Sequence, residues 1–430
     1  MRVLVVGGGG REHALLWALH RDAPDGTFFC LPGNAGTAKL ATNLSGSATD
    51  IETVAAAAKD KHVDLVVVGP EAPLAAGLAD RLARDGIPAF GPSKAAARLE
   101  SSKSFAKSVM RQAGVPTARS HTFTDLAKAL SCIAQHAEPL VVKASGLAAG
   151  KGAIVCATRE EAADALTAML REGALGAAGA EVLIEEFLEG EELSVLAVTD
   201  GNHFAVLPPA QDHKRIGEGD VGPNTGGMGA YCPVSLATPE LLERVSREIF
   251  QPTLKTMRDA GTPYKGILYA GLMIRELDGA PMVIEFNCRF GDPEAQAILA
   301  ATPPGLLPVL RMIAEGGWMP DGMHLGGAKH AAVTTVLAAE GYPNAPKSGA
   351  EIRIPRGLES ATDVMVFHAG TALDREGRLR VAGGRVLAVT AVGPDVASAA
   401  ARSREAAEAI EFEGKQYRRD IGWREIARQR

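Results

Sequence analysis

The first hundred residues alternate between short, mostly apolar runs and longer stretches in which apolar and polar positions mix. The apolar runs lie at residues 3–6, 63–68 and 87–90. Runs of this length favour strands that are buried on both faces, and the stretches between them are long enough for helices. The pattern therefore predicts an α/β domain with a parallel sheet covered by helices on both sides.

A glycine follows each of these runs, and the first run leads into Gly7 to Gly10. Ligands of open parallel sheets bind at the carboxyl ends of the strands. We therefore expect ligand-binding turns at 7–10, 69–71 and 91–93. A glycine turn that opens a helix also suits a phosphate or another small anion, because its free N–H groups point outward.

The first turn lacks the full dinucleotide-binding fingerprint. The pattern G-x-G-x-x-G needs a third glycine, but that position is Glu12 when counted from Gly7 and His13 when counted from Gly8. The next predicted strand, at 27–31, has no acid at its end to hold a ribose. NAD binding is disfavoured, while an anion site and a tight turn without a ligand remain open.

The sequence Gly-Val-Pro-Thr at 114–117 indicates a break between the first domain and the rest of the chain. Four regions follow from this break and from the later strand patterns: 1–119, 120–193, 194–325 and 326–430. Strands are expected at 140–143, 153–157, 181–185, 266–274, 281–285, 332–337, 351–354, 364–368 and 385–390.

The stretch 140–152, LVVKASGLAAGKG, joins a strand to a glycine-rich loop. It fails as a P-loop, because Gly146 and Gly150 are one residue too close and Lys151 precedes a glycine instead of a hydroxyl residue. Lys143 on the strand, Lys151 on the loop and the loop amides can still cradle a triphosphate. A surface hairpin with two solvated lysines is the alternative.

The stretch 182–192, VLIEEFLEGEE, is an apolar strand that ends in acidic residues. A main-chain hinge at 185–188 can pair with an adenine edge, and Glu192 can accept ribose hydroxyls. An acidic turn after a strand is common, so this pattern alone is weak.

The stretch 283–294, VIEFNCRFGDPE, places Glu285 and Asn287 two residues apart, so their side chains share one face of a strand. Mg²⁺ is held by one or two carboxylates together with substrate phosphates, which fits this pair. Arg289 would share that face if the strand continued, and its guanidinium could clamp a phosphate or carboxylate. The alternative is a salt bridge on an edge strand.

Composition limits the function classes. The 430 residues are 46% hydrophobic and 22% charged, with a net charge of −6, which suits a globular protein and argues against a nucleic-acid surface. The five cysteines are dispersed, as in reducing compartments. No apolar run approaches the roughly 20 residues of a membrane helix, and no signal peptide is evident. We expect a cytoplasmic protein without nucleic-acid or membrane partners.

In this order, the three stretches at 140–152, 182–192 and 283–294 resemble the ATP-grasp superfamily. Further motifs narrow the resemblance to the phosphoribosylamine–glycine ligase (glycinamide ribonucleotide synthetase) family, and the resemblance covers nearly the whole chain. The motifs are GGGGREHA at 7–14, VGPE at 68–71, QDHKR at 211–215, NTGGMGA at 224–230, EFNCRFGDPE at 285–294, FHAGT at 367–371 and GGRVL at 383–387.

The resemblance implies an α/β fold (α+β overall) of the ATP-grasp type. Its parts would be an N-terminal Rossmann-like parallel-sheet domain, two ATP-grasp lobes and a C-terminal mixed β domain. The implied reaction joins glycine to 5-phosphoribosylamine, using ATP and Mg²⁺ or Mn²⁺, and yields glycinamide ribonucleotide, ADP and phosphate for purine biosynthesis. The partners would be these small molecules, and the protein would be a monomer or a weak dimer.

The resemblance also assigns roles by position. The ATP-binding residues would be Lys103, Lys143, Ser145, Gly146, Gly150, Lys151, Glu185, Glu186, Phe187, Leu188 and Glu192. The metal ligands would be Glu285 and Asn287. The catalytic residues would be Arg289, Lys214 and Asp212. The substrate pocket would comprise Gly8, Gly9, Gly10, Pro70, Glu71, Thr225 and Gly226.

The chain departs from related patterns at two places. Many ATP-grasp enzymes carry a second metal-binding glutamate on the preceding strand, but residues 269–273 read YAGLM. Family members often continue Gly-x-Tyr-x-Lys-Gly near 341, where this chain has GYPNAPKSG at 341–349. We therefore leave the number of metal ions open and assign no substrate contacts at 341–349.

Three other functions compete with this interpretation. The reaction implied by the resemblance passes through a glycyl phosphate, and another ATP-grasp ligase or carboxylase would likewise activate its carboxylate as an acyl phosphate. A nucleotide-binding protein without catalysis would bind ATP and release no ADP. A dehydrogenase is disfavoured by the incomplete fingerprint at residues 7–13.

Overall fold

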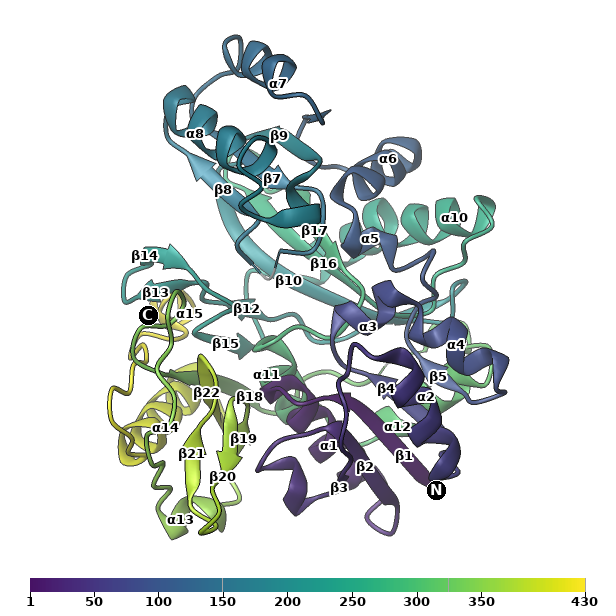
Figure 1. Cartoon of the computed structure of the whole chain (residues 1–430), viewed down its shortest axis with the longest axis vertical. Helices are drawn as coiled ribbons and strands as arrows, with labels where there is room; N and C mark the ends of the chain where they lie inside the picture. The colour runs from purple at the N-terminus through teal and green to yellow at the C-terminus, as the bar shows by residue number, and fades with distance from the viewer. Residues whose placement is uncertain (149, 324, 430) are drawn as a thin grey trace.

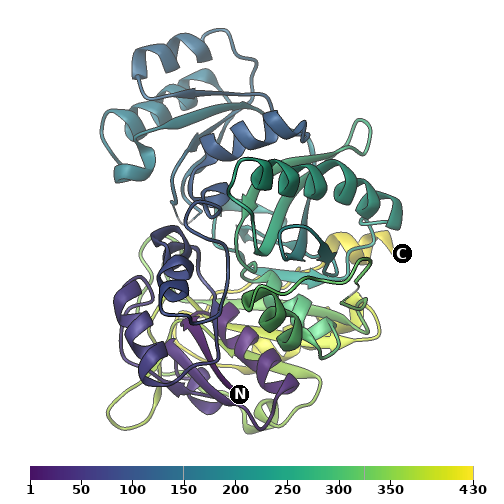
Figure 2. The same ribbon diagram turned by 90° about the vertical axis from the view of Figure 1, so that its right-hand side faces the viewer.

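The structure is a computed structural model that describes residues 1–148, 150–323 and 325–429. Figures 1 and 2 show an upper lobe, formed by residues around 120–190, that stands above a broader base. The N-terminal and C-terminal parts of the chain lie side by side in that base. The candidate site is built where the lobe, the base and a central sheet meet.

The N-terminal part forms the predicted parallel sheet, in the order β3-β2-β1-β4-β5. Its middle strands are fully or almost fully buried, which explains their continuous apolar sequences. The strands are β1 (Arg2–Gly7), β2 (Thr27–Pro32), β3 (Thr42–Asn43), β4 (Leu65–Val68) and β5 (Ala89–Phe90). The helices are α1 (Gly10–Asp22), α2 (Ile51–Asp60), α3 (Glu71–Ala76), α4 (Leu78–Arg84), α5 (Arg98–Ser101) and α6 (Lys103–Ala113).

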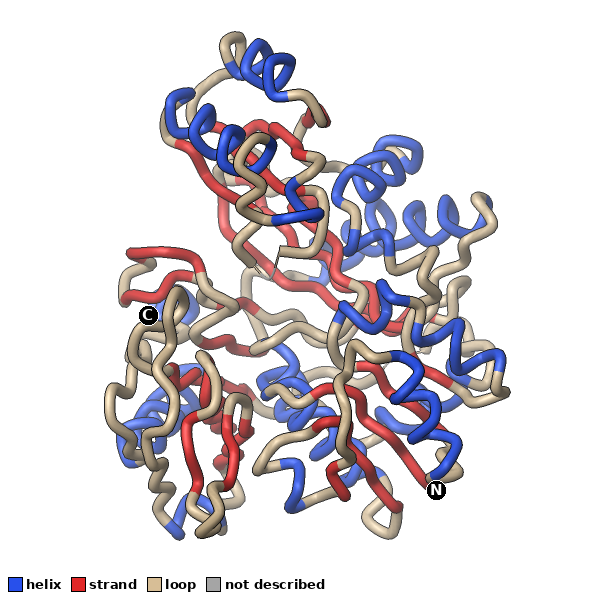
Figure 3. Tube along the Cα trace, viewed as in Figure 1, coloured by secondary structure: helices blue, strands red, loops and turns tan. Residues whose placement is uncertain are grey.

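The upper lobe is an antiparallel sheet in the order β6-β9-β7-β8. Two helices pack on it and on each other, and Figure 3 shows them beside the red strands. The strands are β6 (Ser120–Phe123), β7 (Leu140–Ala144), β8 (Ala153–Cys156) and β9 (Val182–Glu186), and the helices are α7 (Leu126–Ile133) and α8 (Arg159–Leu170). The glycine-rich loop joins β7 to β8.

The central sheet is antiparallel, in the order β11-β10-β16-β17. Its strands are β10 (Gly190–Thr199), β11 (Phe204–Val206), β16 (Gly266–Arg275) and β17 (Pro281–Asn287), and helices α9 (Pro239–Val245) and α10 (Gln251–Asp259) precede β16. Gly271 pairs with Glu285 across β16 and β17. The strand opposite Glu285 therefore supplies no second acid at this register, as its sequence predicts.

The C-terminal sheet has the order β12-β15-β18-β22-β19. Two of its strands, β12 (Gln211–Asp212) and β15 (Gly229–Cys232), come from residues before 326. The others are β18 (Ala331–Ala338), β19 (Val364–His368) and β22 (Arg385–Gly393), and helix α14 (Val396–Ala409) packs on β18 and β22. Two short hairpins, β13 (Arg215–Gly217) with β14 (Val221–Asn224) and β20 (Thr371–Leu373) with β21 (Leu379–Val381), stand apart.

The predicted strand at 351–354 forms only in part. Glu351 and Arg353 make isolated bridges to Arg380 and Glu411 instead of pairing along a strand. The four-region division of the chain stays a prediction, because β10 runs across residue 193 and the C-terminal sheet draws on residues 211–232.

Helix α11 (Glu294–Ala301) joins the halves of the base and is buried on almost all sides. It packs against α1 on one side and against β15, β18 and β22 on the other. Helix α12 (Leu306–Ala314) follows it. Within the described ranges no single helix has the length and hydropathy to cross a membrane, while α11 and α12, bent by 116°, pass that test only as a pair.

Candidate active site

Lys143 on β7 is held inside the protein by a carboxylate. Its Nζ lies 2.9 Å from Glu185 Oε2 on the neighbouring strand β9 and donates to the carbonyl of Ile284 at 3.1 Å. Lys107 on α6 lies 3.2 Å from the other oxygen of Glu185. All three charged side chains are buried. Lys143 is therefore not one of a pair of solvated hairpin lysines.

Glu285 and Asn287 share one face at the end of β17, as their spacing predicts. Burial alone would raise the pKa of Glu285, but Lys103, Lys214, Lys143 and Arg289 together hold it below its usual value. Glu285 is therefore an ionised carboxylate surrounded by cations from four parts of the chain.

Arg289 lies just beyond the end of β17, and its side chain still reaches the predicted metal ligand. Its Nη2 donates to Asn287 Oδ1 at 3.1 Å and lies 3.1 Å from Glu100 Oε1, while its Nε lies 3.4 Å from Glu71 Oε2. Burial opposes the charge of Arg289, but the carboxylates of Glu100 and Glu71 outweigh it and raise its pKa. The alternative interpretation, a salt bridge on an edge strand, therefore also describes this segment in part, since the ion pairs of Arg289 join the predicted substrate residue Glu71 to the predicted metal face.

Glu192, Asp212 and Lys214 form a charge cluster between β10 and β12. Lys214 Nζ pairs with Glu192 Oε2 and lies 3.7 Å from Asp212 Oδ1. Burial raises the pKa of Asp212 to about 7 against the opposing effect of Lys214, and Glu294 and Glu192 add to the rise. Asp212 can therefore exchange a proton near neutral pH.

The glycine turn at residues 7–10 is filled by the protein's own carboxylate. Gly9 N–H donates to Glu12 Oε2 at 2.6 Å, and Arg11 Nε donates to Glu12 Oε1 at 2.6 Å. A Cβ on Gly7 would lie 2.4 Å from Glu12 Cγ, so the glycines make room for this side chain. Glu12 occupies the place where a dinucleotide-binding turn holds a pyrophosphate, which is a physical reason against NAD at this turn.

The other glycines of the turn face residues from distant parts of the chain. A Cβ on Gly10 would lie 2.8 Å from Gln296 Nε2 on α11, and one on Gly9 would lie 3.7 Å from Asp292 Oδ2. Asp292 in turn accepts from Arg385 Nη2 at 2.9 Å. The turn, the EFNCRFGDPE motif and the GGRVL motif therefore meet at one place.

Thr225 and Gly226 lie beside the charge cluster of Glu192, Asp212 and Lys214. Thr225 N–H and Oγ1 both donate to the carbonyl of Lys214 at 2.8 Å, and Gly226 N–H donates to Tyr342 Oη at 2.9 Å. Arg385 Nη1 donates to the carbonyl of Gly226. These bonds fix the segment beside the charge cluster.

The glycine-rich loop begins at Ser145, where it is tied to α6. Lys103 N–H donates to the carbonyl of Ser145 at 2.8 Å, and Ser104 N–H donates to Ser145 Oγ at 3.2 Å. Gly150 has φ of +78°, and a Cβ there would lie 3.7 Å from the carbonyl of Thr225. Lys151 is exposed. The predicted loop also contains residue 149, which lies outside the described residues.

The predicted adenine hinge follows β9. Glu186 is tied to Arg119, which donates from its N–H at 2.9 Å and from its Nε at 2.7 Å. The side chains of Phe187 and Leu188 are at least partly accessible. Glu185, the first residue of the predicted hinge at 185–188, is by contrast buried within β9, and its carboxylate is engaged with Lys107 and Lys143.

The donor set fits a divalent cation that substrate phosphates help to hold. Among the described residues no group of three or more His, Cys, Asp or Glu side chains could hold a metal ion. Glu285 and Asn287 offer one carboxylate and one amide oxygen, which suits Mg²⁺ or Mn²⁺ when phosphates complete the shell.

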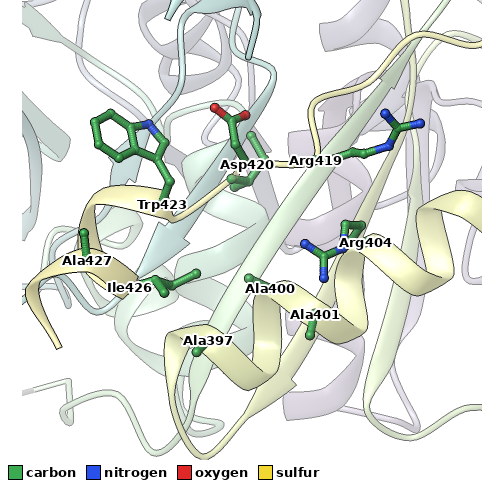
Figure 4. A pocket seen from close by; sticks show the side chains of 10 residues that line it. Ala397, Ala400, Ala401, Arg404, Arg419, Asp420, Trp423, Ile426 and Ala427 are labelled. Carbon is green, nitrogen blue, oxygen red and sulfur yellow. The ribbon is translucent and has the colours of Figure 1, made fainter. Parts of the chain in front are cut away.

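The cavity in Figure 4 lies away from these residues. It has a volume of about 520 Å³ and lies between α14 and α15 (Trp423–Arg428). Its lining includes Arg404, Trp423 and Ile426 and none of the predicted site residues.

Three family models match the chain in succession. They describe the N domain, the ATP-grasp (A) domain and the C domain of phosphoribosylglycinamide synthetase, at residues 1–100, 101–295 and 332–424. The chain belongs to the phosphoribosylglycinamide synthetase family. The ATP-grasp fold that the sequence predicts is thereby confirmed, and the use of ATP and a divalent metal is typical of the family.

Curated relatives match the chain from end to end. A phosphoribosylamine–glycine ligase of Brucella melitensis is 48% identical over 430 residues, which cover 100% of this chain and 99% of the relative. A trifunctional purine biosynthetic protein adenosine-3 of Homo sapiens is 47% identical, and the match covers 99% of this chain but 42% of that protein. In the human protein, the region similar to this chain is therefore one part of a longer polypeptide.

Solved structures agree with the sequence relatives. A phosphoribosylamine–glycine ligase from Thermotoga maritima superposes with a TM-score of 0.85 at 36% identity, covering 98% of this chain and 100% of that one. A biotin carboxylase from Campylobacter jejuni superposes with a TM-score of 0.76 at 16% identity, covering 99% of this chain and 95% of that one. The second match shows the shared fold alone.

The structure brings most predicted residues to one region, but it adds partners that the sequence reading did not include. Lys107, Glu100, Glu12 and Arg385 each hold a predicted residue or its backbone in place. Lys107 and Glu100 lie on short helical stretches, and the only signal of their role is a charged residue at a buried helix position.

Proposed function

We infer that this protein catalyses the ATP-dependent ligation of glycine to 5-phosphoribosylamine, a step of purine biosynthesis. The observation that carries this conclusion is the match along the whole length of phosphoribosylamine–glycine ligases at 48% identity. The products are glycinamide ribonucleotide, ADP and phosphate.

The chemistry requires an activated carboxylate, because a carboxylate does not acylate an amine at neutral pH. The glycine carboxylate attacks the γ-phosphorus of ATP, the bond from this phosphorus to the bridging oxygen breaks, and ADP leaves. The amine of phosphoribosylamine then attacks the carbonyl carbon, a C–N bond forms, and phosphate leaves as the amine loses a proton. The protein's contribution is positioning and charge stabilisation.

On the nucleotide side, we assign the phosphates to Lys103, Lys143, Lys151 and the amides of the loop at 145–152. The buried pairing of Lys143 with Glu185 supports this assignment, because it fixes the lysine on a rigid strand. Adenine is assigned to the hinge at 185–188 and the ribose to Glu192. Glu185 contributes through Lys143, since its carboxylate is already paired with two lysines.

Glu285 and Asn287 are assigned as ligands of Mg²⁺ or Mn²⁺. When bound, this ion neutralises charge on the transferring phosphoryl group. The lowered pKa of Glu285 supports the assignment, because the carboxylate stays ionised and ready to bind a cation. Arg289 Nη2 donates to Asn287 Oδ1, so the guanidinium fixes the orientation of this amide.

On the acceptor side, we assign Arg289, Lys214 and Asp212 to the reacting groups, and Gly8, Gly9, Gly10, Pro70, Glu71, Thr225 and Gly226 to the pocket walls. The carboxylates of Glu71 and Asp212 can hold an ammonium group, and Asp212 can accept the proton that the amine loses. Because Gly9 N–H already donates to Glu12, the turn acts through its shape and its remaining amides.

ADP release from the purified protein tests this function. Phosphoribosylamine is generated in place from ribose 5-phosphate and ammonia, and reactions with ATP and Mg²⁺ are compared with and without glycine. ADP that appears only when both substrates are present supports the ligase. ADP formed without glycine, in the presence of bicarbonate or formate, identifies another ATP-grasp enzyme, and ATP binding without any ADP identifies a non-catalytic nucleotide-binding protein.

A further inference from the structure

The side chains of residues 211–214 lie on two opposite faces, and the two faces have different partners. Side chains along an extended backbone point alternately to opposite sides. Asp212 and Lys214 belong to the charge cluster on one side. Gln211 and His213, each about 1% exposed, are buried on the other side. Two buried polar side chains directly behind two active-site charges need partners, because an unpaired buried polar group is costly.

The same alternation occurs on β10. Glu192 pairs with Lys214 in the charge cluster, whereas its neighbour Glu191 faces Gln211, which donates to Glu191 Oε1 at 2.7 Å. Gln211 Nε2 also donates to the carbonyl of Glu192 at 2.6 Å, and Tyr231 Oη donates to Gln211 Oε1 at 2.5 Å. Gln211 therefore ties the backbone of Glu192 to the strand that carries Asp212.

Helix α15, near the end of the described chain, covers the face that carries Gln211 and His213. Arg428 Nη2 on α15 pairs with Glu191 Oε1, and Arg428 Nη1 lies 3.0 Å from Glu425 Oε2. Glu425 is buried and also accepts from Ser235 N–H at 3.1 Å. The pairing with Glu191 outweighs the effect of burial and raises the pKa of Arg428.

Two more contacts hold residues 418–422, which lead into α15. Gly422 N–H donates to His213 Nε2 at 2.8 Å. The guanidinium of Arg418 is fully buried and pairs with Asp220 and Asp420 at 2.8 and 2.7 Å. Figure 1 shows the C-terminus and α15 beside β13 and β14, next to β12.

We propose that residues 418–428, the C-terminal segment, are a positioning element for the charge cluster, with Arg428 acting through Glu191 and Gln211 on Glu192 and Asp212. The element contacts the face of residues 211–214 opposite the one that carries Asp212 and Lys214. Its last four residues, 425–428, lie beyond residue 424, where the match to the C-domain model ends. The proposal rests on the assignment of Glu192 to the nucleotide, so it predicts an effect on ATP affinity.

Arg428→Met tests the proposal in the full-length protein. It removes the contact with Glu191 while keeping a long side chain on α15. We expect the Kd for ATP, measured by titration without the other substrates, to rise about fivefold. Loss of a charge-assisted hydrogen bond costs more than about tenfold at its own site, and only a part of that cost reaches Glu192 through Glu191 and Gln211. The KM for ATP should rise in parallel, with a much smaller change in kcat, and Arg428→Lys should recover part of the affinity.

The matched control is Arg404→Met on the neighbouring helix α14, where the arginine is exposed and lines the cavity of Figure 4. The control should keep wild-type affinity. A second test combines Arg428→Met with Glu191→Gln. Because both changes break the same contact, the double variant should bind ATP about as weakly as each single variant.

Two results would overturn the proposal. One is unchanged ATP affinity in Arg428→Met. The other is a loss of kcat and of affinity for every substrate in proportion to a fall in melting temperature, since that pattern indicates a purely structural role. The titration needs no turnover, so it tests the proposal even if ADP release fails to support the ligase.

Discussion

At the scale of single residues, the sequence predicted those side chains whose chemistry follows from strand spacing. Glu285 and Asn287 lie two residues apart on one strand, so their common face could be inferred. The strand that carries Lys143 was also predicted, but the pairing of Lys143 with Glu185 was not. Lys107 and Glu100 could not be inferred, because they lie on helices and act through partners far away in the sequence. The role of a buried charged residue can be recognised only when the structure shows its partner, as with Lys107 and Glu185.

Replacing Lys143 by alanine should weaken ATP binding while the fold persists. Lys107 still pairs with Glu185 in this variant, so the buried carboxylate keeps a cationic partner. We expect a rise of about tenfold or more in the Kd for ATP, which corresponds to about 1.4 kcal/mol. Titration with ATP checks this, with exposed Lys128→Ala on α7 as the control, and wild-type affinity would remove Lys143 from the nucleotide site.

The pH dependence should report Asp212. Burial raises its pKa to about 7, so the group keeps its proton below pH 7 and loses it above. Because only the ionised form can accept the proton of the attacking amine, we expect kcat/KM to rise with pH through about 7. Asp212→Asn should lower kcat/KM and abolish this rise, whereas Asp25→Asn on the surface should keep it. An unaltered profile in Asp212→Asn would contradict this role.

At the scale of elements, long apolar strands were predictable and very short ones were not. The strands β1, β4, β16 and β17 match apolar runs in the sequence. By contrast, β12 has only two residues, and β15, with the sequence GAYC, lacks the branched aliphatic residues that mark the equally short β4. Their membership of the C-terminal sheet could therefore not be foreseen. The predicted strand at 351–354 fails to extend for a related reason, since its pairing is limited to isolated bridges.

The glycine-rich loop should close when ATP binds. Gly150 has a positive φ and Lys151 is exposed, so the loop offers trypsin an accessible site. We expect ATP with Mg²⁺ to slow cleavage after Lys151 by about tenfold, as expected for a lid that orders over its ligand. Cleavage after partly exposed Lys61 in the same digest provides the control. Equal rates at Lys151 with and without ATP would speak against closure.

At the scale of the whole molecule, the site depends on contacts that no local pattern encodes. Helix α11 brings the N-terminal turn, the EFNCRFGDPE motif and the C-terminal sheet together, and its mostly apolar sequence, EAQAILAA, hints only that it is buried. Arg385 then binds Asp292 and Gly226 across these parts. The resemblance to a family gave the order of the domains, but it did not give these contacts.

Removing the contacts of Arg385 with Asp292 and Gly226 should destabilise the protein, and the size of the loss should depend on pH. Burial alone would raise the pKa of Asp292, but Arg385 and Arg11 hold it below its usual value, so its ionised form stabilises the fold at neutral pH. Arg385→Met should lower the free energy of unfolding by about 1–3 kcal/mol at pH 7. The loss should shrink as the pH falls through the carboxyl range. Denaturant unfolding at several pH values checks this, with exposed Arg404→Met as the control, and a loss independent of pH would exclude the pairing as its cause.

We propose that the assembled site activates the glycine carboxylate by phosphorylation. The most direct measurement uses glycine labelled with ¹⁸O in its carboxylate, together with ATP and phosphoribosylamine, and follows the label by mass spectrometry. Because the carboxylate oxygen that attacks phosphorus leaves with it, one ¹⁸O should appear in each inorganic phosphate released. Phosphate without the label, formed alongside glycinamide ribonucleotide, would contradict the account.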